Sequence, residues 1–80
     1  MRYEVYSCRF DIAEHLYTVF DAESDAEAIG RFREIVARPD NAWESMRMIQ
    51  VIQERKVKSI AVINRMDEVD AKVVIHSKEQ

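Results

Sequence analysis

The stretch that decides the fold runs Phe20-Asp-Ala-Glu-Ser24-Asp-Ala-Glu27-Ala-Ile-Gly-Arg-Phe-Arg-Glu-Ile-Val36. Ser24 and Glu27 stand three residues apart directly before an apolar run, which is the signature of a capping box at a helix start. Apolar residues then recur at spacings of three and four, and they form one stripe: Ala28, Ile29, Phe32, Ile35 and Val36. We therefore expect a helix over about residues 25–37 whose apolar stripe packs on a sheet.

The two ends of this helix carry further signals. Pro39 disfavours a helical conformation for Arg38, so the helix should end about there. Glu27 and Arg31 are four residues apart and are expected to pair on the outer side, for a few tenths of a kcal/mol.

Two strands are expected before the helix. Residues Arg2–Phe10 and Leu16–Ala22 are rich in aromatic and β-branched residues, with Asp11–His15 as the turn between them. The apolar pattern of the first strand changes face, which indicates either a bulge near Tyr6–Ser7 or a strand covered on both sides. Alternation alone leaves the core side of the second strand undecided.

The segment Asn41–Arg55 is ambiguous between helix and strand. Asn41 followed by Glu44 is compatible with a second helix cap. Wound as a helix, however, the apolar residues of the segment would spread around the whole surface instead of forming a stripe. We therefore favour a strand from about Met46 to Gln53.

The C-terminal part predicts two more strands. Ser59–Asn64 and Ala71–Ser77 are rich in β-branched residues, and the charged stretches Glu54–Lys58 and Arg65–Asp70 separate them from what precedes. The expected order is ββαβββ. The fold class is α+β, with one antiparallel sheet of about five strands packed on one helix, and residues 1–80 are expected to form one domain.

Composition narrows the function classes. The chain is 48% apolar and 34% charged, enough for a core, and its single glycine leaves no room for a Gly-rich phosphate loop. A single cysteine excludes an internal disulfide and fits a reducing compartment. There is no long apolar run, so we expect no membrane span and a cytoplasmic location. The formal charge of −3 argues against a protein that coats nucleic acid.

The junction Phe20-Asp-Ala-Glu-Ser-Asp-Ala-Glu-Ala-Ile29 resembles the strand-to-helix junction of small accessory proteins of phages and mobile elements, including some anti-CRISPR proteins. The resemblance covers residues 1–37. It implies a fold in which a hairpin, one helix and a further meander make one sheet packed on the helix. Those proteins share architecture without a common site, so the resemblance transfers no catalytic or binding residue.

Cys8, His15 and His76 are the candidates for nucleophilic or soft-metal chemistry. None of them stands at metal-ligand spacing from another, and no Gly-rich loop offers an oxyanion site. We therefore expect structural roles for all three, no cofactor and no enzymatic activity.

Acidic residues cluster at the helix start, where Asp21, Glu23, Asp25 and Glu27 fall within seven positions. Carboxylates there complement the helix dipole. Alternatively, Asp21, Glu23 and Asp25 belong to an acidic face that occupies a basic groove on a partner protein. Trp43 is either a core residue or, if exposed, an anchor of a protein interface.

A basic group surrounds the predicted turn between the third and fourth strands: Arg55, Lys56 and Lys58, with Arg65 as a further member. Charged residues at a strand turn are usually only solvated. The alternative is contact with the phosphates of a nucleic acid, which would make binding strongly salt-dependent.

Together these observations predict a non-enzymatic protein-binding module. The resemblance suggests an inhibitor that occupies the surface of a host defence complex, in the host cytoplasm if the protein is encoded by a phage. The alternative is a small nucleic-acid-binding or regulatory protein that uses the Arg55–Lys58 turn. One helix cannot cover both faces of a sheet, so a homodimer through the open face or an edge strand is also expected.

Overall fold

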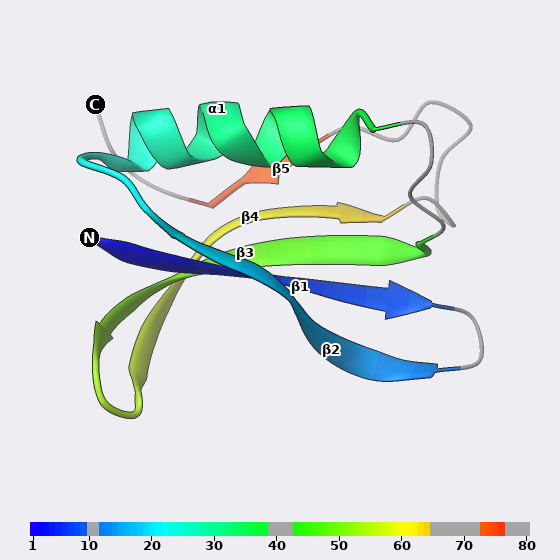
Figure 1. Ribbon diagram of the computed structural model, residues 1–80, viewed down its shortest axis with the longest axis horizontal. Coiled ribbons are helices and arrows are strands. Elements are labelled where there is room, and N and C mark those ends of the chain that lie inside the picture. Colours follow the sequence, from blue (N-terminus) through cyan, green and yellow to red (C-terminus); the bar gives the residue numbers. More distant parts are fainter. Residues whose placement is uncertain (10–11, 39–42, 65–72, 77–80) are drawn as a thin grey trace.

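The computed structural model describes residues 1–9, 12–38, 43–64 and 73–76 (Figure 1). The elements are β1 (Arg2–Arg9), β2 (Ile12–Asp21), α1 (Asp25–Val36), β3 (Ser45–Gln53), β4 (Lys56–Asn64) and β5 (Val74–Ile75). The strands form one antiparallel sheet in the order β2-β1-β3-β4-β5. The helix lies along one face of this sheet, which confirms the α+β class and the ββαβββ order.

The helix forms as its sequence predicts. Ser24 has extended backbone geometry, and its hydroxyl accepts a hydrogen bond from the Glu27 amide at 3.2 Å. Phe32 is fully buried, and it belongs with Ala28 and Ile35 to the core. Ile29 and Val36 are partly buried against that core. The predicted stripe is therefore the face that α1 turns to the sheet.

Both hairpins have shorter turns than predicted. β2 begins at Ile12, which pairs with Arg9, so the prediction of a turn over Asp11–His15 is wrong from residue 12 onward. β4 begins at Lys56, directly after a turn in which Arg55 has a φ of 65°, so the predicted turn Glu54–Lys58 is too long. Strand pairing depends on hydrogen bonds between backbone groups. The strands therefore extend into segments whose polar residues have low strand propensity.

The ambiguous segment is a strand where the structure describes it. β3 spans Ser45–Gln53, so the favoured prediction of a strand is confirmed and a helix over this stretch is excluded. β5 covers Val74–Ile75, inside the predicted Ala71–Ser77. The predicted turn Arg65–Asp70 lies outside the described residues.

Of the four register shifts in the described sheet, two lie beside core residues. The register between β1 and β2 shifts between Val5 and Tyr6, because β2 carries Tyr17 as an extra residue. The expected irregularity therefore lies in the partner strand, and β1 alternates regularly. In β4 the register shift places Ile60 as the extra residue, and both Ile60 and Ala61 are fully buried in the core.

The sheet consequently has a covered face and an open face. Tyr3, Val5 and Ser7 of β1 point to the helix side and are buried. Glu4 and Tyr6 alternate with them on the opposite side, which no described helix covers (Figure 1). We call this opposite side the uncovered face. Its members include Arg2, Glu4, Tyr6, Glu14, Leu16, Val19, Asp21, Arg47, Ile49, Val51, Val57, Ser59, Val62 and Val74.

Candidate functional site

The acidic helix start is mostly built into the fold. The Asp25 side chain is 8% exposed, the Tyr3 hydroxyl donates to its Oδ1 at 2.6 Å, and Lys58 Nζ lies 3.3 Å from its Oδ2. Asp25 therefore points into the molecule. The prediction that Asp25 belongs to an exposed acidic face is wrong, because its carboxylate is buried. Asp21 and Glu23 are exposed. Two carboxylates, rather than three, are left at this end for an acidic partner-binding face.

Glu27 and Arg31 do not form the expected i,i+4 pair in the described part of the chain. The Glu27 carboxylate accepts a hydrogen bond from the Glu23 amide at 2.7 Å, which closes the helix start. The Arg31 guanidinium instead lies over the Phe20 ring, with its Cζ 5.0 Å from the ring centroid. The capping contact and the aromatic contact thus take the two side chains in different directions.

Trp43 is a core residue. It is 5% exposed and packs in the same cluster as Phe32 and Met46. Between the two interpretations of Trp43, the geometry favours the structural one, because almost none of the ring surface is left for a partner to contact.

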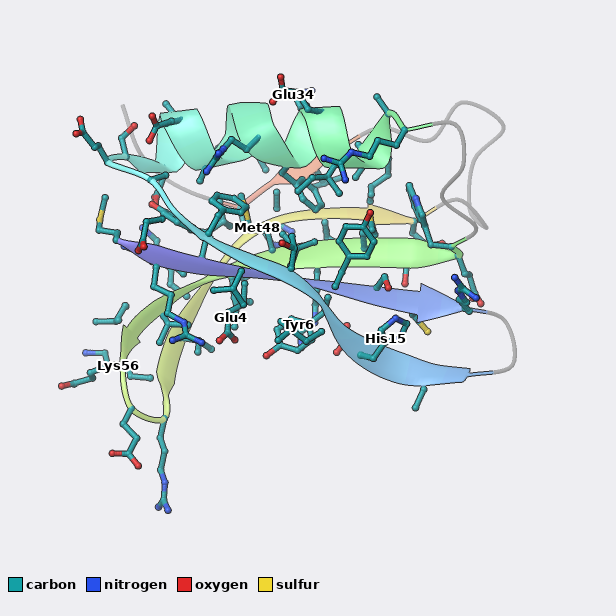
Figure 2. The ribbon with its side chains drawn as sticks, in the orientation of Figure 1. Glu4, Tyr6, His15, Glu34, Met48 and Lys56 are labelled. Carbon is teal, nitrogen blue, oxygen red and sulfur yellow. The ribbon has the colours of Figure 1, made fainter. Side chains whose placement is uncertain are left out.

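The structure separates the members of the predicted basic group around the β3–β4 turn. Arg55 and Lys56 are exposed at the end of the β3–β4 hairpin, which projects from the body of the sheet (Figures 1 and 2). Lys58 lies closer to the body and pairs with Asp25. Arg65 lies outside the described residues. The hairpin end therefore presents two of the four predicted cations to solvent.

A polar network crosses the middle of the uncovered face. Arg47 of β3 donates from Nε and Nη2 to the two carboxylate oxygens of Glu14 of β2, at 2.7 and 2.8 Å. Its Cζ lies 4.8 Å from the centroid of the Tyr6 ring on the strand between them. The Tyr6 hydroxyl donates to Glu4 at 2.7 Å, and Arg2 pairs with the other Glu4 oxygen at 3.0 Å. Five side chains from three strands are thus held in one arrangement.

This network changes the acid–base behaviour of its members. The hydrogen bonds from Arg47 hold the pKa of the Glu14 carboxyl below its ordinary value of 4.5, and they raise the pKa of the Arg47 guanidinium. The hydrogen bond to the Glu4 carboxylate raises the pKa of the Tyr6 phenol, because that bond favours the neutral hydroxyl. All of these shifts favour the ionisation states that keep the network closed at neutral pH.

Apolar side chains surround the network. Leu16 and Val19 on β2, Val57 on β4 and Val74 on β5 are between 39% and 53% exposed. These four were not singled out from the sequence, because their alternation along each strand does not say which face the helix covers. The face to which each of these side chains points can be assigned only when the strand register, including the bulges, is known.

The candidates for catalysis or metal binding lie apart. The His15 Nε2 is 3.2 Å from the Ser7 hydroxyl, and the His76 Nδ1 is 2.8 Å from the Ser59 hydroxyl. Cys8 is half-buried. Within residues 1–9, 12–38, 43–64 and 73–76, no three His, Cys, Asp or Glu side chains converge as metal ligands would. In the same ranges no helix is long and apolar enough to cross a membrane.

No match to this chain is found among protein families, curated proteins or solved structures. Function must therefore be inferred from the chemistry of the surfaces described above. Of these, the uncovered face combines exposed apolar side chains with a charge network that packing of the core does not explain.

Proposed function

We propose that this protein is a non-enzymatic protein-binding module and that the uncovered face is its binding surface. The observation that carries the proposal is the combination of half-exposed apolar side chains with charges that are already paired. Val57 and Val74 lie at 53% exposure on neighbouring strands, and each would gain by losing contact with water.

The paired charges favour a protein partner over nucleic acid. Arg47 is neutralised by Glu14 and Arg2 by Glu4, so the centre of the face carries little net charge. A phosphate-binding surface needs an excess of cations, and a surface that imitates phosphates needs an excess of anions. The face also contains Tyr6, Arg2 and Arg47, and tyrosine and arginine are enriched in protein interfaces.

The partner class follows from the architectural resemblance. On that basis the partner would be a host defence complex, the mode would be occupation of its surface, and the location would be the host cytoplasm if a phage encodes the protein. The resemblance supports this part of the proposal, and the uncovered face supports the binding mode alone.

Site-directed photo-crosslinking in the host lysate tests the proposal. A photo-crosslinking residue at Val57 should capture a defined protein, whereas the same residue at Arg33, an exposed position of α1, should not. The captured protein, once purified, should bind Val57→Lys and Val74→Lys at least tenfold more weakly than the parent chain. Glu34→Lys, as the matched control, should bind within twofold. Equal binding by all four chains would overturn the proposal.

The projecting β3–β4 hairpin supports a second candidate, nucleic-acid binding through Arg55 and Lys56. Both side chains are exposed at the end of an arm, where they can reach into a groove. A gel-shift series against salt separates the candidates. Binding that falls steeply with salt and is lost in Arg55→Gln/Lys56→Gln would establish the second candidate, because each phosphate contact adds to the salt dependence. Absence of any shift would exclude it.

A further inference from the structure

The outer edge of β2 has backbone groups available for another strand. β2 is the terminal strand of the described sheet. Met1 and Ala22 exchange both of their backbone hydrogen bonds, at 2.9 and 3.0 Å. Hydrogen-bonded pairs alternate with non-bonded pairs in an antiparallel ladder, so Val19 and Asp21 direct their N–H and C=O groups away from β1. Both residues lie in Thr18–Asp21, the part of β2 that follows the bulge at Tyr17 and pairs with β1 in a regular register.

A groove of about 410 Å³ runs beside this edge, between β2 and α1. Tyr17, Thr18 and Phe20 line it from the strand. Arg31, Glu34 and Ile35 line it from α1, and Arg38 lines it from just beyond the C-terminal end of the helix. Arg31 lies within α1, and Arg38 is two residues past Val36, where the helix ends. The groove therefore presents two guanidinium groups beside the strand, together with the Glu34 carboxylate.

Neither guanidinium is neutralised by a carboxylate of the described chain. Arg31 donates to the Asp21 carbonyl oxygen at 3.3 Å and lies over Phe20. Arg38 donates to the Tyr17 hydroxyl at 3.4 Å. These contacts orient the two side chains toward β2 while most of their N–H donors stay available. In contrast, Arg47 and Arg2 on the uncovered face each pair with a glutamate.

The opposite side of the same strand is apolar. Leu16 is 48% exposed and Val19 is 39% exposed, both on the uncovered face. A strand added beside β2 would place alternate side chains on the two faces. One set would meet Arg31 and Arg38, and the other set would meet Leu16 and Val19.

From this juxtaposition we infer that the β2 edge binds an extended peptide segment in which acidic residues alternate with apolar ones. Main-chain hydrogen bonds with both backbone groups of Val19 and with the Asp21 N–H would hold the segment as a sixth strand, while the Asp21 carbonyl already accepts from Arg31. Acidic side chains two positions apart are separated by about 7 Å, within reach of two long guanidinium side chains that accept carboxylates in a forked geometry. The inference goes beyond the proposed function, because a peptide can bind at the β2 edge whether or not a protein occupies the rest of the uncovered face.

The test uses a fluorescein-labelled synthetic peptide with three glutamates alternating with two valines between terminal glycines. Its anisotropy should rise on addition of the full chain at low salt, and the amide NMR signals of Val19 and Asp21 should shift. Arg31→Gln and Arg38→Gln should each weaken binding at least tenfold, Arg31→Lys less than Arg31→Gln. Arg33→Gln, an exposed arginine of the same helix outside the groove, should bind within twofold of the parent.

Two further peptides separate strand addition from general charge attraction. Replacing the glutamates by lysines should abolish binding. Replacing one valine by proline keeps all three carboxylates. In an antiparallel pairing the valines lie opposite Val19 and Asp21, so this change removes a backbone donor that faces β2, and it should weaken binding at least tenfold. Equal binding by the proline peptide, equal loss in Arg33→Gln, or no binding of the glutamate peptide at millimolar concentration would each overturn the inference. Thermal unfolding of every variant shows whether it remains folded.

Discussion

At the residue scale, Asp25 shows how position in a helix can conceal a role in the core. Its place after Ser24 is typical of an acidic residue that stabilises a helix start. The fold brings the Tyr3 hydroxyl and the Lys58 ammonium to the same carboxylate, from strands that are distant in sequence. A buried carboxylate with such partners links the helix to two strands, and its removal should cost more than a dipole contact.

We predict that Asp25→Asn lowers the free energy of unfolding by about 1–3 kcal/mol, because a charge-assisted acceptor for two buried or half-buried donors is lost. Urea unfolding measures the change. The controls are Asp21→Asn and Glu23→Gln, which alter exposed carboxylates at the same end of the helix and should change stability by about 0.5 kcal/mol or less. Equal losses in all three variants would show that Asp25 acts only through the helix dipole.

The ion pair between Glu14 and Arg47 predicts a pH dependence. The pKa of Glu14 is lowered in the folded protein by the hydrogen bonds from Arg47. Its contribution to stability is therefore complete above the unfolded-state pKa and is lost as the pH falls through the lowered folded-state pKa. The side chains are 38% and 42% exposed, so solvent screening keeps the contribution below about 1 kcal/mol despite the forked geometry.

Accordingly, Glu14→Gln should be slightly less stable than the parent chain near neutral pH, and the difference should shrink toward zero in acid. Chemical unfolding at a series of pH values measures this. Arg47→Gln should show the same pH trend, since it removes the other half of the pair. A stability difference that grows as the pH falls would contradict this account of the network.

At the scale of elements, the helix is the part whose packing face the sequence predicts best. The apolar stripe from Ala28 to Val36 needs only helical periodicity to be recognised. The strands are harder, because each bulge moves the following residues to the other face. Tyr17 of β2 and Ile60 of β4 are two such extra residues, and neither carries a signal such as glycine that would mark it.

Phe32→Ala should destabilise the protein by roughly 3–5 kcal/mol, because the ring is fully buried where α1 meets the sheet. In a domain of this size such a loss can unfold much of the population. Thermal and urea unfolding measure it, with Arg33→Ala as the control on the neighbouring exposed position. A melting temperature within a degree or two of the parent chain would mean that the helix packs through another face.

At the scale of the whole molecule, one helix cannot shield both faces of a five-stranded sheet. The core lies between α1 and the covered face, and it takes up nearly all the large buried side chains. Leu16, Val19, Val57 and Val74 stay half-exposed on the other face. Exposed apolar surface of this kind favours association.

In the absence of a partner, we predict that two copies associate through the uncovered face at about 100 µM, since the same side chains can bury one another around a two-fold axis. Sedimentation equilibrium should then give twice the chain mass of 9.4 kDa. Val57→Lys should return the mass to that of one chain, whereas Glu34→Lys should not. A single-chain mass for the parent would contradict self-association and would leave the face to a different protein.

From the sequence alone, the helix and its cap, the strand order along the chain and the identity of the helical core face could be predicted, because they depend on local spacing that survives in any context. The arrangement of the surfaces could not. The partners of Asp25, the burial of Trp43, the Glu14–Arg47 network and the two unneutralised arginines beside β2 depend on strand register. The tertiary structure alone sets that register, because a single extra residue in a strand reverses the face of every side chain after it.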